Sequence, residues 1–215
     1  MIRILFSLAS YLAGAVPFGM IIARKVADMD ITQRGSGNIG ATNVARELGL
    51  KWGLLTLLLD LLKGFIPVSL FAVFSPNQDL GLAVIGLSAL LGHQFSVFKK
   101  FRGGKGVATA LGVYLALAPL STLVAVVVFV LTVAVSKFVS LSSLLSACIM
   151  PVLFVFTGRG WVLITASILM AGLICLKHRE NIQRLIRGEE RKWGKKVANQ
   201  EPPATDQIRR QNRNE

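Results

Sequence analysis

Seven long apolar runs, separated by charged or glycine-rich segments, constrain the fold of this chain more than any other feature. A helix needs about 20 apolar residues to cross the roughly 30 Å hydrocarbon core of a bilayer. The composition agrees, because 53% of the residues are hydrophobic, only 16% are charged and the mean hydropathy is +0.60. The chain is therefore predicted to be an all-α integral membrane protein. Its expected spans are residues 4–23, 53–74, 80–98, 106–118, 120–136, 141–157 and 161–176.

The number of spans depends on residues 106–136, which form either one long helix or two short ones broken at Ala118-Pro119. The distribution of basic residues separates these alternatives, since cytoplasmic loops carry an excess of Lys and Arg. Seven spans place 21 of the 24 Lys and Arg residues on one side, whereas six spans put the basic tail opposite the basic loops. We expect seven transmembrane helices, an outside N-terminus and a cytoplasmic C-terminus, with the first span retained rather than cleaved as a signal.

The net charge of +13 suits either a nucleic-acid footprint or basic residues at a membrane surface. In so apolar a chain the membrane explains the charge, and no nucleic-acid partner is expected. Two Cys and two His at unfamiliar spacings do not predict a metal site. Residues 1–197 are expected to form one transmembrane domain, followed by a polar and disordered tail at 198–215.

The segment GSGNIGATN, residues 35–43, contains the G-x-G-x-x-G pattern of dinucleotide-binding turns. A polar, charged linker precedes it where a dinucleotide fold requires an apolar strand, so this context excludes a nucleotide fold. Two interpretations remain. The segment is either a flexible glycine turn, or a loop whose glycines and following helix, starting near Thr42, approach an anion closely.

Other polar residues fall on the same predicted side of the membrane. The sequence GGKG, residues 103–106, directly precedes a span, so the free N–H groups of that helix and the Lys105 charge favour an anion site. Basic anchoring at the membrane interface is the alternative. His93, at the inner end of the third span, is either a packing residue or a proton acceptor for an alcohol. Asp60 and Lys63 are three residues apart in the second span and are expected to form a structural pair.

His178, Asn181 and Arg184 follow the last span at steps of three and share one face of a predicted helix. Taken alone, this segment is more typical of a solvated charged face. Taken together, the loops offer glycine turns, basic side chains, a hydroxyl, an imidazole and an amide at one membrane surface. This combination favours a phosphorylated substrate that meets an apolar one.

These motifs resemble those of the acyl-phosphate-dependent glycerol-3-phosphate acyltransferases, the PlsY family. The resemblance rests on GSGNIGATN, on GH followed by FRGGKGVAT, on Ser140-Leu141 and on HRENIQRLIRGEE, and it extends through about Lys196. It implies a bacterial inner-membrane enzyme of phospholipid synthesis, with a cytoplasmic active site and seven spans in the same orientation. Such an enzyme transfers a fatty acyl group from acyl phosphate to the sn-1 hydroxyl of glycerol 3-phosphate, giving lysophosphatidic acid and phosphate. The resemblance implies no cofactor, no metal and no obligate protein partner beyond the lipid bilayer.

The resemblance also assigns roles to individual residues. The expected catalytic residues are Ser36, His93 and Asn181, and those expected to bind glycerol 3-phosphate are Arg46, Lys105, Ser140 and His178. The acyl-phosphate group is expected at Gly37, Asn38, Gly40, Thr42, Asn43, Gly103, Gly104 and Gly106. Supporting roles fall to Asp60, Lys63 and Glu190.

Several points stay open in the sequence. Either His93 or a phosphate oxygen of the substrate takes the hydroxyl proton, and a covalent acyl-serine at Ser36 is the less favoured route. Ser142 stands where many relatives have Gly, so Ser142 or Ser143 can substitute for Ser140. The rival functions are a transporter of organic phosphates and a CDP-alcohol phosphotransferase. The crowding of polar motifs on one face and the lack of an internal repeat argue against the first. The missing carboxylate cluster in the loops argues against the second.

Overall fold

The computed structural model describes residues 1–75 and 78–194, so the tail predicted to be disordered at 198–215 lies outside the described residues. The described chain is helical and contains no strand, which confirms the all-α prediction. Two short 3-10 turns, η1 (Ile31–Gln33) and η2 (Val97–Lys99), lie in loops. The α-helices are α1 (Ile2–Ala15), α2 (Phe18–Ala27), α3 (Ala41–Leu48), α4 (Leu50–Phe74), α5 (Asp79–Gln94), α6 (Val107–Leu117), α7 (Pro119–Ser136), α8 (Val139–Phe156), α9 (Trp161–Lys177) and α10 (Arg179–Ile186).

All seven predicted apolar runs are helical, but they differ in length. Five segments of the described chain are long and apolar enough to cross a membrane, and α9 with α10 forms a sixth that is bent by 63°. Helix α6 is also apolar, but its 11 residues reach only about 16 Å. Since α6 ends at Leu117 and α7 begins at Pro119, residues 106–136 form two helices, as the basic residues predicted. Seven crossings and their orientation stay predictions.

The first predicted span, residues 4–23, is broken at Val16-Pro17 into α1 and α2. Proline has no N–H and its ring disturbs the preceding turn, so the last carbonyls of α1 lose their helical donors. Side chains from elsewhere replace these donors: the Ser96 hydroxyl donates to the Ala15 carbonyl (2.6 Å) and the Lys63 ammonium donates to the Val16 carbonyl (2.9 Å). The break is therefore held by specific hydrogen bonds, as a non-helical backbone in a membrane requires.

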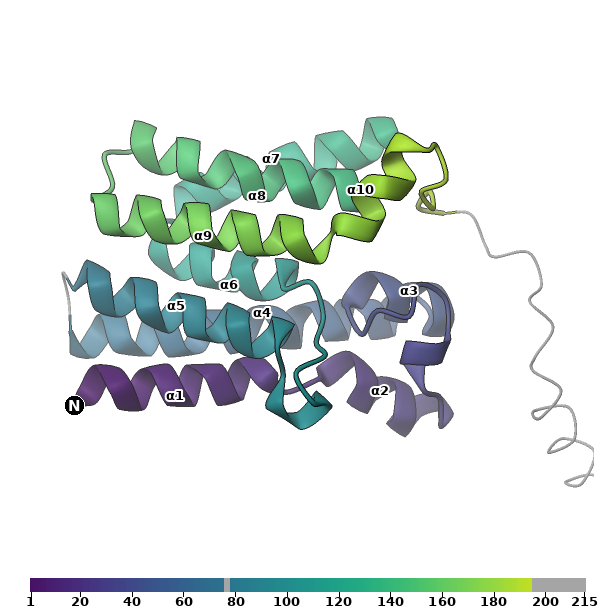
Figure 1. Ribbon diagram of the computed structural model, residues 1–215, viewed down its shortest axis with the longest axis horizontal. Coiled ribbons are helices and arrows are strands. Elements are labelled where there is room, and N and C mark those ends of the chain that lie inside the picture. The colour runs from purple at the N-terminus through teal and green to yellow at the C-terminus, as the bar shows by residue number, and fades with distance from the viewer. Residues whose placement is uncertain (76–77, 195–215) are drawn as a thin grey trace, which may run out of the picture.

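The spanning helices lie side by side along the long axis of the molecule (Figure 1). Helix α4 packs closely on α6 because Gly64 and Gly112 lie against the backbone of the partner helix, at Thr109 and Leu61. The buried apolar side chains of α4, α5, α6, α8 and α9 form the core, which includes Phe71, Leu90 and Phe154. Apolar residues such as Leu120 and Val135 remain exposed on the outside, where lipid would cover them.

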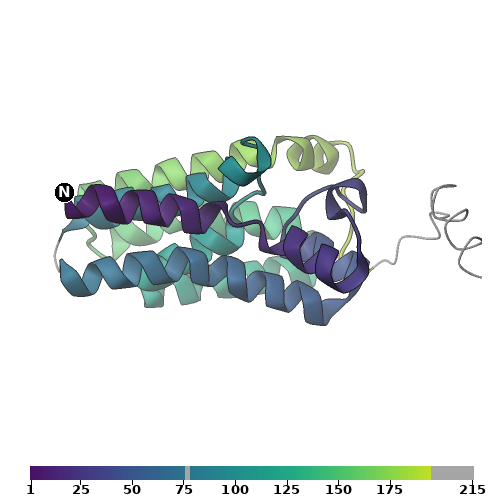
Figure 2. The same cartoon turned by 90° about the horizontal axis from the view of Figure 1, so that it is seen from below.

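One end of the bundle carries the short helices. Figure 1 shows α2, α3 and α10 together at the end opposite Met1, and Figure 2 shows the same separation from below. The glycine-containing loop before α3 and the segment after α10 also lie at this end. The polar motifs of the sequence therefore gather at one end of the bundle.

Candidate active site

A cavity of about 480 Å³ lies at this end of the bundle, within the usual size range of ligand pockets. One part of it is polar and is lined by the loop before α3, the starts of α6 and α8, and α10. The other part is apolar and is lined by α6, α7, α8 and the end of α9, for example by Leu111, Phe129, Met150 and Ile174. The cavity thus joins a polar and an apolar region.

Most of the residues predicted for the site line this cavity. They are Ser36, Asn38, Gly40, Thr42, Asn43, Arg46, Asp60, His93, Lys105, Gly106, Ser140, His178, Asn181 and Glu190. Four predicted residues, Gly37, Lys63, Gly103 and Gly104, are not among the lining residues. The packing of the helices therefore brings together residues that are far apart in the sequence, from Ser36 near the start of the chain to Glu190 near its end.

The side chain of Asn43 holds the GSGNIGATN loop in place. Its buried Oδ1 accepts from the Ser36 N–H (2.8 Å), and its Nδ2 donates to the carbonyls of Arg34 (3.0 Å) and Asn38 (2.9 Å). The Asn38 Oδ1 in turn accepts from the Gly40 N–H (2.9 Å), just before α3 begins. Both ends of the Asn43 amide are thus engaged by the loop itself. Asn43 thus shapes the loop that carries Ser36, and its predicted contact with acyl phosphate stays a prediction.

Three helices begin at the cavity wall. The first residues of α3, α6 and α8, which are Ala41, Val107 and Val139, all line the cavity. The first N–H groups of a helix have no partner within it, and the helix dipole places partial positive charge at that end. Three such ends around one cavity make an environment that favours anions.

Side chains from four segments form a hydrogen-bonded chain across the polar part. The Lys105 ammonium donates to the Asn181 Oδ1 (2.5 Å), and the Asn181 Nδ2 donates to the Glu190 Oε1 (2.6 Å). The Ser140 hydroxyl also donates to this Glu190 oxygen (2.8 Å), while the Arg184 Nε donates to the other (2.8 Å). Glu190 therefore organises the catalytic candidate Asn181 and the binding candidates around it.

Arg184 was not among the predicted site residues, although it lines the cavity. The available signal was its spacing of three residues from Asn181, which places both on one face of α10. Arg191 also lines the cavity and was missed, because it lies beyond the last helix where no periodicity applies. Together with Arg46 and Lys105, Arg184 and Arg191 supply four cationic groups to the cavity lining. Burial lowers the pKa of Lys105 to about 8, although the nearby Glu190 acts in the opposite direction.

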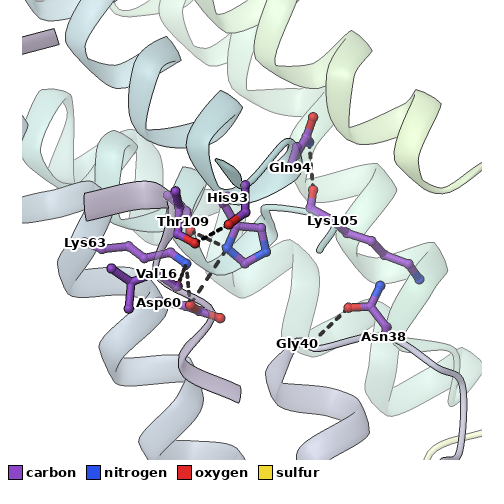
Figure 3. A network of polar contacts seen from close by, with 11 residues as sticks. Val16, Asn38, Gly40, Asp60, Lys63, His93, Gln94, Lys105 and Thr109 are labelled. Carbon is purple, nitrogen blue, oxygen red and sulfur yellow. Dashed lines mark hydrogen bonds and ion pairs between the residues drawn. The ribbon is translucent and has the colours of Figure 1, made fainter. Parts of the chain in front are cut away.

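His93 lies in a buried polar cluster with residues from α4 and α6, drawn in Figure 3. Its Nδ1 is 3.1 Å from the Thr109 Oγ1 and 3.8 Å from the Asp60 Oδ1. Asp60 pairs with Lys63 (2.7 Å), so the predicted ion pair is present and almost fully buried. The sequence did not predict Thr109 as a site residue, because nothing in its sequence context distinguishes it from other threonines in the apolar spans.

The loop glycines Gly103 and Gly104 do not act as free anion donors in this structure. Their N–H groups donate to the carbonyls of Gln94 (3.2 Å) and His93 (3.1 Å), which terminates α5. A Cβ atom on Gly104 would collide with the His93 Nε2. These glycines therefore allow the loop to approach His93, whereas the predicted role was direct contact with phosphate.

The hydroxyls of Ser140, Ser142 and Ser143 differ in their positions and partners. Ser140 and Ser143 line the cavity, whereas Ser142 does not, and its hydroxyl donates to the Phe138 carbonyl (2.9 Å). The Ser143 hydroxyl is also engaged, by the Val139 carbonyl (2.8 Å). Ser140 alone of the three bonds to another side chain of the cavity, Glu190.

The chain is similar to known proteins over most of its length. Residues 4–188 match the family model for glycerol-3-phosphate acyltransferase. The glycerol-3-phosphate acyltransferases of Geotalea daltonii and Trichlorobacter lovleyi are 46% and 47% identical to this chain, over 87% and 86% of it and over 96% and 94% of their own lengths.

Solved structures show the same fold. The crystal structure of PlsY (YgiH), an integral membrane glycerol 3-phosphate acyltransferase, in its glycerol 3-phosphate form has a TM-score of 0.87 and 40% identity. This match covers 90% of this chain and 96% of that chain. The lysophosphatidic acid form gives a TM-score of 0.84 at the same identity and coverage. The chain therefore belongs to the glycerol-3-phosphate acyltransferase family of integral membrane proteins.

Proposed function

We propose that this acyltransferase moves a fatty acyl group from acyl phosphate to the sn-1 hydroxyl of glycerol 3-phosphate, releasing 1-acylglycerol 3-phosphate and inorganic phosphate. The observation that carries the proposal is the cavity in which three helix starts and four cationic groups meet an apolar region. This arrangement suits two phosphate-bearing substrates, one of which has a long apolar chain.

The charges of the polar part support two anions rather than one. Arg46, Lys105, Arg184 and Arg191 face two lining carboxylates, and one of these, Asp60, is already paired with Lys63. Glycerol 3-phosphate and acyl phosphate together would bring enough negative charge to balance the remaining cations. Following the resemblance, Arg46, Lys105, Ser140 and His178 are assigned to glycerol 3-phosphate.

His178 is prepared for such a role by its own hydrogen bond. Its Nδ1 lies 2.8 Å from the Ile174 carbonyl, which can only accept, so Nδ1 carries the hydrogen. In the neutral ring Nε2 is then an acceptor on a side chain that lines the cavity. It can accept a hydrogen bond from a hydroxyl of the glycerol backbone.

The apolar part suits the fatty acyl chain. Side chains such as Ala110, Leu111, Ala147 and Met150 line it along α6 and α8. Burying methylene groups there is worth about 0.8 kcal/mol each, which binds the chain of acyl phosphate without any specific contact.

The reaction needs little activation by the protein, because acyl phosphate is a mixed anhydride. The glycerol oxygen attacks the acyl carbon, the bond from that carbon to the phosphate oxygen breaks, and phosphate leaves with the electron pair. The hydroxyl proton goes to His93 or to a phosphate oxygen. Donors around Ser36 would stabilise the oxyanion that forms at the acyl carbon. The loss of one such donor typically costs about 2.7 to 4 kcal/mol.

The membrane placement follows from the charge distribution. With seven spans and a cytoplasmic C-terminus, the cavity end of the bundle faces the cytoplasm of a bacterial inner membrane, where glycerol 3-phosphate is available. A reporter fused after Lys137 should then be cytoplasmic, and one fused near Arg159 should be outside. The reverse result would contradict this orientation.

The function is tested with the purified protein in detergent or nanodiscs, palmitoyl phosphate and glycerol 3-phosphate. We expect stoichiometric release of phosphate and lysophosphatidic acid without CoA or added metal. Ser36→Ala and His93→Ala should abolish turnover, while Ser88→Ala, a change on α5 outside the cavity, should leave it intact. Turnover with palmitoyl-CoA but not with palmitoyl phosphate would refute the proposed donor. Uptake of glycerol 3-phosphate into proteoliposomes without acyl transfer would favour a transporter.

A further inference from the structure

The apolar part of the cavity narrows with distance from the polar part. Its walls carry half-buried side chains, among them Leu111, Val126 and Phe129. The lining of α6 and α8 ends at Tyr114 and Met150, whose exposed fractions are only 4% and 1%. The apolar part therefore tapers toward these two side chains.

The turn between α6 and α7 holds this end of the cavity in place. The Ala118 N–H donates to the Tyr114 carbonyl (2.7 Å), and both the N–H and the hydroxyl of Thr122 donate to the Ala118 carbonyl (2.9 Å each). Thr122 is the first residue of α7 that lines the cavity, and its side chain is buried. The break before Pro119 thus brings Tyr114 and Thr122 to the same end of the apolar part.

Packing from α8 and α9 backs this end of the cavity. The Tyr114 and Phe154 rings meet edge to face, with centroids 5.8 Å apart and an interplanar angle of 85°. Phe154, one turn beyond Met150, is fully buried, and the Tyr114 hydroxyl lies 3.4 Å from the Ser167 carbonyl. Because a close-packed interior has no room for added methylene groups, a chain that reaches Tyr114 and Met150 can go no further.

The helix rise gives the depth of this acyl compartment. The first and last apolar lining residues are Val107 and Tyr114 on α6, and Val139 and Met150 on α8. At 1.5 Å per residue these separations correspond to about 10 Å and about 16 Å. An extended chain advances about 1.2 Å per bond, since a residue with three backbone bonds spans at most about 3.6 Å. The longer wall therefore matches roughly 13 bonds, which is a fatty acyl chain of about 14 carbons.

We propose that Tyr114, Met150 and Thr122 form the floor of the acyl compartment and limit the length of the fatty acyl chain that this enzyme transfers. For the acyl phosphate donor, this inference rests on the proposed function. The floor predicts an optimum length rather than a general preference for long chains. A short chain leaves a void above the floor and loses dispersion contacts, whereas a chain that is too long presses against packed side chains.

The test compares decanoyl, myristoyl, palmitoyl, stearoyl and arachidoyl phosphate with the purified protein in nanodiscs. Each donor is supplied at the same mole fraction of the same lipid, so that differences in partitioning do not enter the comparison. We expect kcat/KM for the donor to be highest near myristoyl phosphate and to fall at least about threefold for decanoyl and arachidoyl phosphate. A flat profile from myristoyl to arachidoyl phosphate would overturn the inference.

Two substitutions should move the optimum in opposite directions. Tyr114→Leu shortens a floor side chain, so the optimum should move to palmitoyl or stearoyl phosphate. Ala125→Leu, one turn from Thr122, extends into the cavity that Ala125 lines, so the optimum should move toward decanoyl phosphate. Phe156→Leu on α8 and Ala134→Leu on α7 are the matched controls, because both positions are exposed and lie outside the cavity lining. A merely structural role would lower the stability of the two floor variants without moving the optimum.

A binding measurement separates this inference from the proposed function. Thermal unfolding in detergent, with 1-acylglycerol 3-phosphates of the same chain series at equal mole fraction, requires no acyl donor. We expect the stabilisation to be largest near the myristoyl compound and to shift in Tyr114→Leu and Ala125→Leu as the kinetic optimum does. If acyl phosphate is not used but these binding profiles shift, the proposed function fails and the floor stands. If acyl phosphate is used and neither variant moves the optimum, the floor is wrong.

Discussion

Lys105 provides a prediction that can be worked out in numbers. In the proposed function its charge attracts the phosphate of glycerol 3-phosphate, yet burial lowers its pKa from 10.5 to about 8. A group with a pKa of 8 is about 90% protonated at pH 7 and about 10% protonated at pH 9. The phosphate of the substrate stays a dianion over this range, because its second pKa is about 6. We therefore expect kcat/KM for glycerol 3-phosphate to fall roughly tenfold between pH 7 and pH 9.

The assay measures phosphate release at limiting glycerol 3-phosphate and saturating palmitoyl phosphate, with non-enzymatic hydrolysis subtracted at each pH. Because kcat/KM reports the free enzyme, its decline should show a midpoint near pH 8. Lys105→Arg is the matched variant. Its guanidinium stays charged throughout, so its profile should be flat even if its kcat/KM is lower. Lys105→Met should also give a flat profile, at a much lower level.

The effect of Lys105 on stability cannot explain such a decline, because it has the opposite sign. The pKa of Lys105 is lower in the folded state than its ordinary value of 10.5, so the unfolded chain binds more protons between about pH 8 and 10.5. The contribution of this residue to stability therefore increases with pH in that window. If kcat/KM of the wild-type protein stays constant to pH 9.5, or Lys105→Arg shows the same decline, then Lys105 is not the titrating group.

Two further predictions follow from close contacts. Gly104→Ala should lower kcat at least about tenfold, since the new methyl group displaces the His93 ring, whereas Gly172→Ala on α9, where a Cβ meets nothing within 4 Å, should keep wild-type kcat. Equal kcat for both variants would show that His93 tolerates displacement. Glu190→Gln should lower the free energy of unfolding by about 1 to 3 kcal/mol, because it weakens three hydrogen bonds to a charged group. Thermal unfolding should show little change for the exposed Glu189→Gln, and equal effects would refute this role.

The contribution of Glu190 to stability should depend on pH, and as is usual for a carboxylate it should be lost in acid. Partial burial alone would raise its pKa, but hydrogen bonds from Arg184, Asn181 and Ser140 hold the pKa below the ordinary value of 4.5. The stability that it contributes is complete above pH 4.5 and is lost as the pH falls through the lowered pKa. The difference between wild type and Glu190→Gln should therefore shrink in acid.

The sequence was sufficient for the helical architecture because apolar runs and proline act locally. The division at Ala118-Pro119 is an example, since proline is favoured at the start of a helix and disturbs the turn before it. The break at Val16-Pro17 follows the same rule, but it lies inside a continuous apolar run. The donors Lys63 and Ser96, which come from distant segments, help to stabilise it.

The sequence predicted residues of the cavity where a motif marks them by residue type. It did not predict residues or contacts that depend on tertiary packing. Ser36 and Lys105 stand in motifs whose glycines mark a close approach, and both line the cavity. Sequence patterns do not show whether a backbone N–H already has a partner, and so they could not reveal that the N–H groups of Gly103 and Gly104 donate to carbonyls at the end of α5. Arg191 is brought to the cavity by the chain after α10, which tertiary packing alone determines.

The position of the cavity at one end of the bundle has a consequence for the membrane itself. Under the proposed reaction, each turnover creates a new lipid molecule on the side where α3, α6 and α8 begin. The acyl chain leaves the apolar region into the adjacent leaflet, so that leaflet gains area while the opposite one does not. A bilayer enlarged by this enzyme would bend under the area difference. Balanced growth of such a membrane therefore requires a separate step that carries lipid from one leaflet to the other.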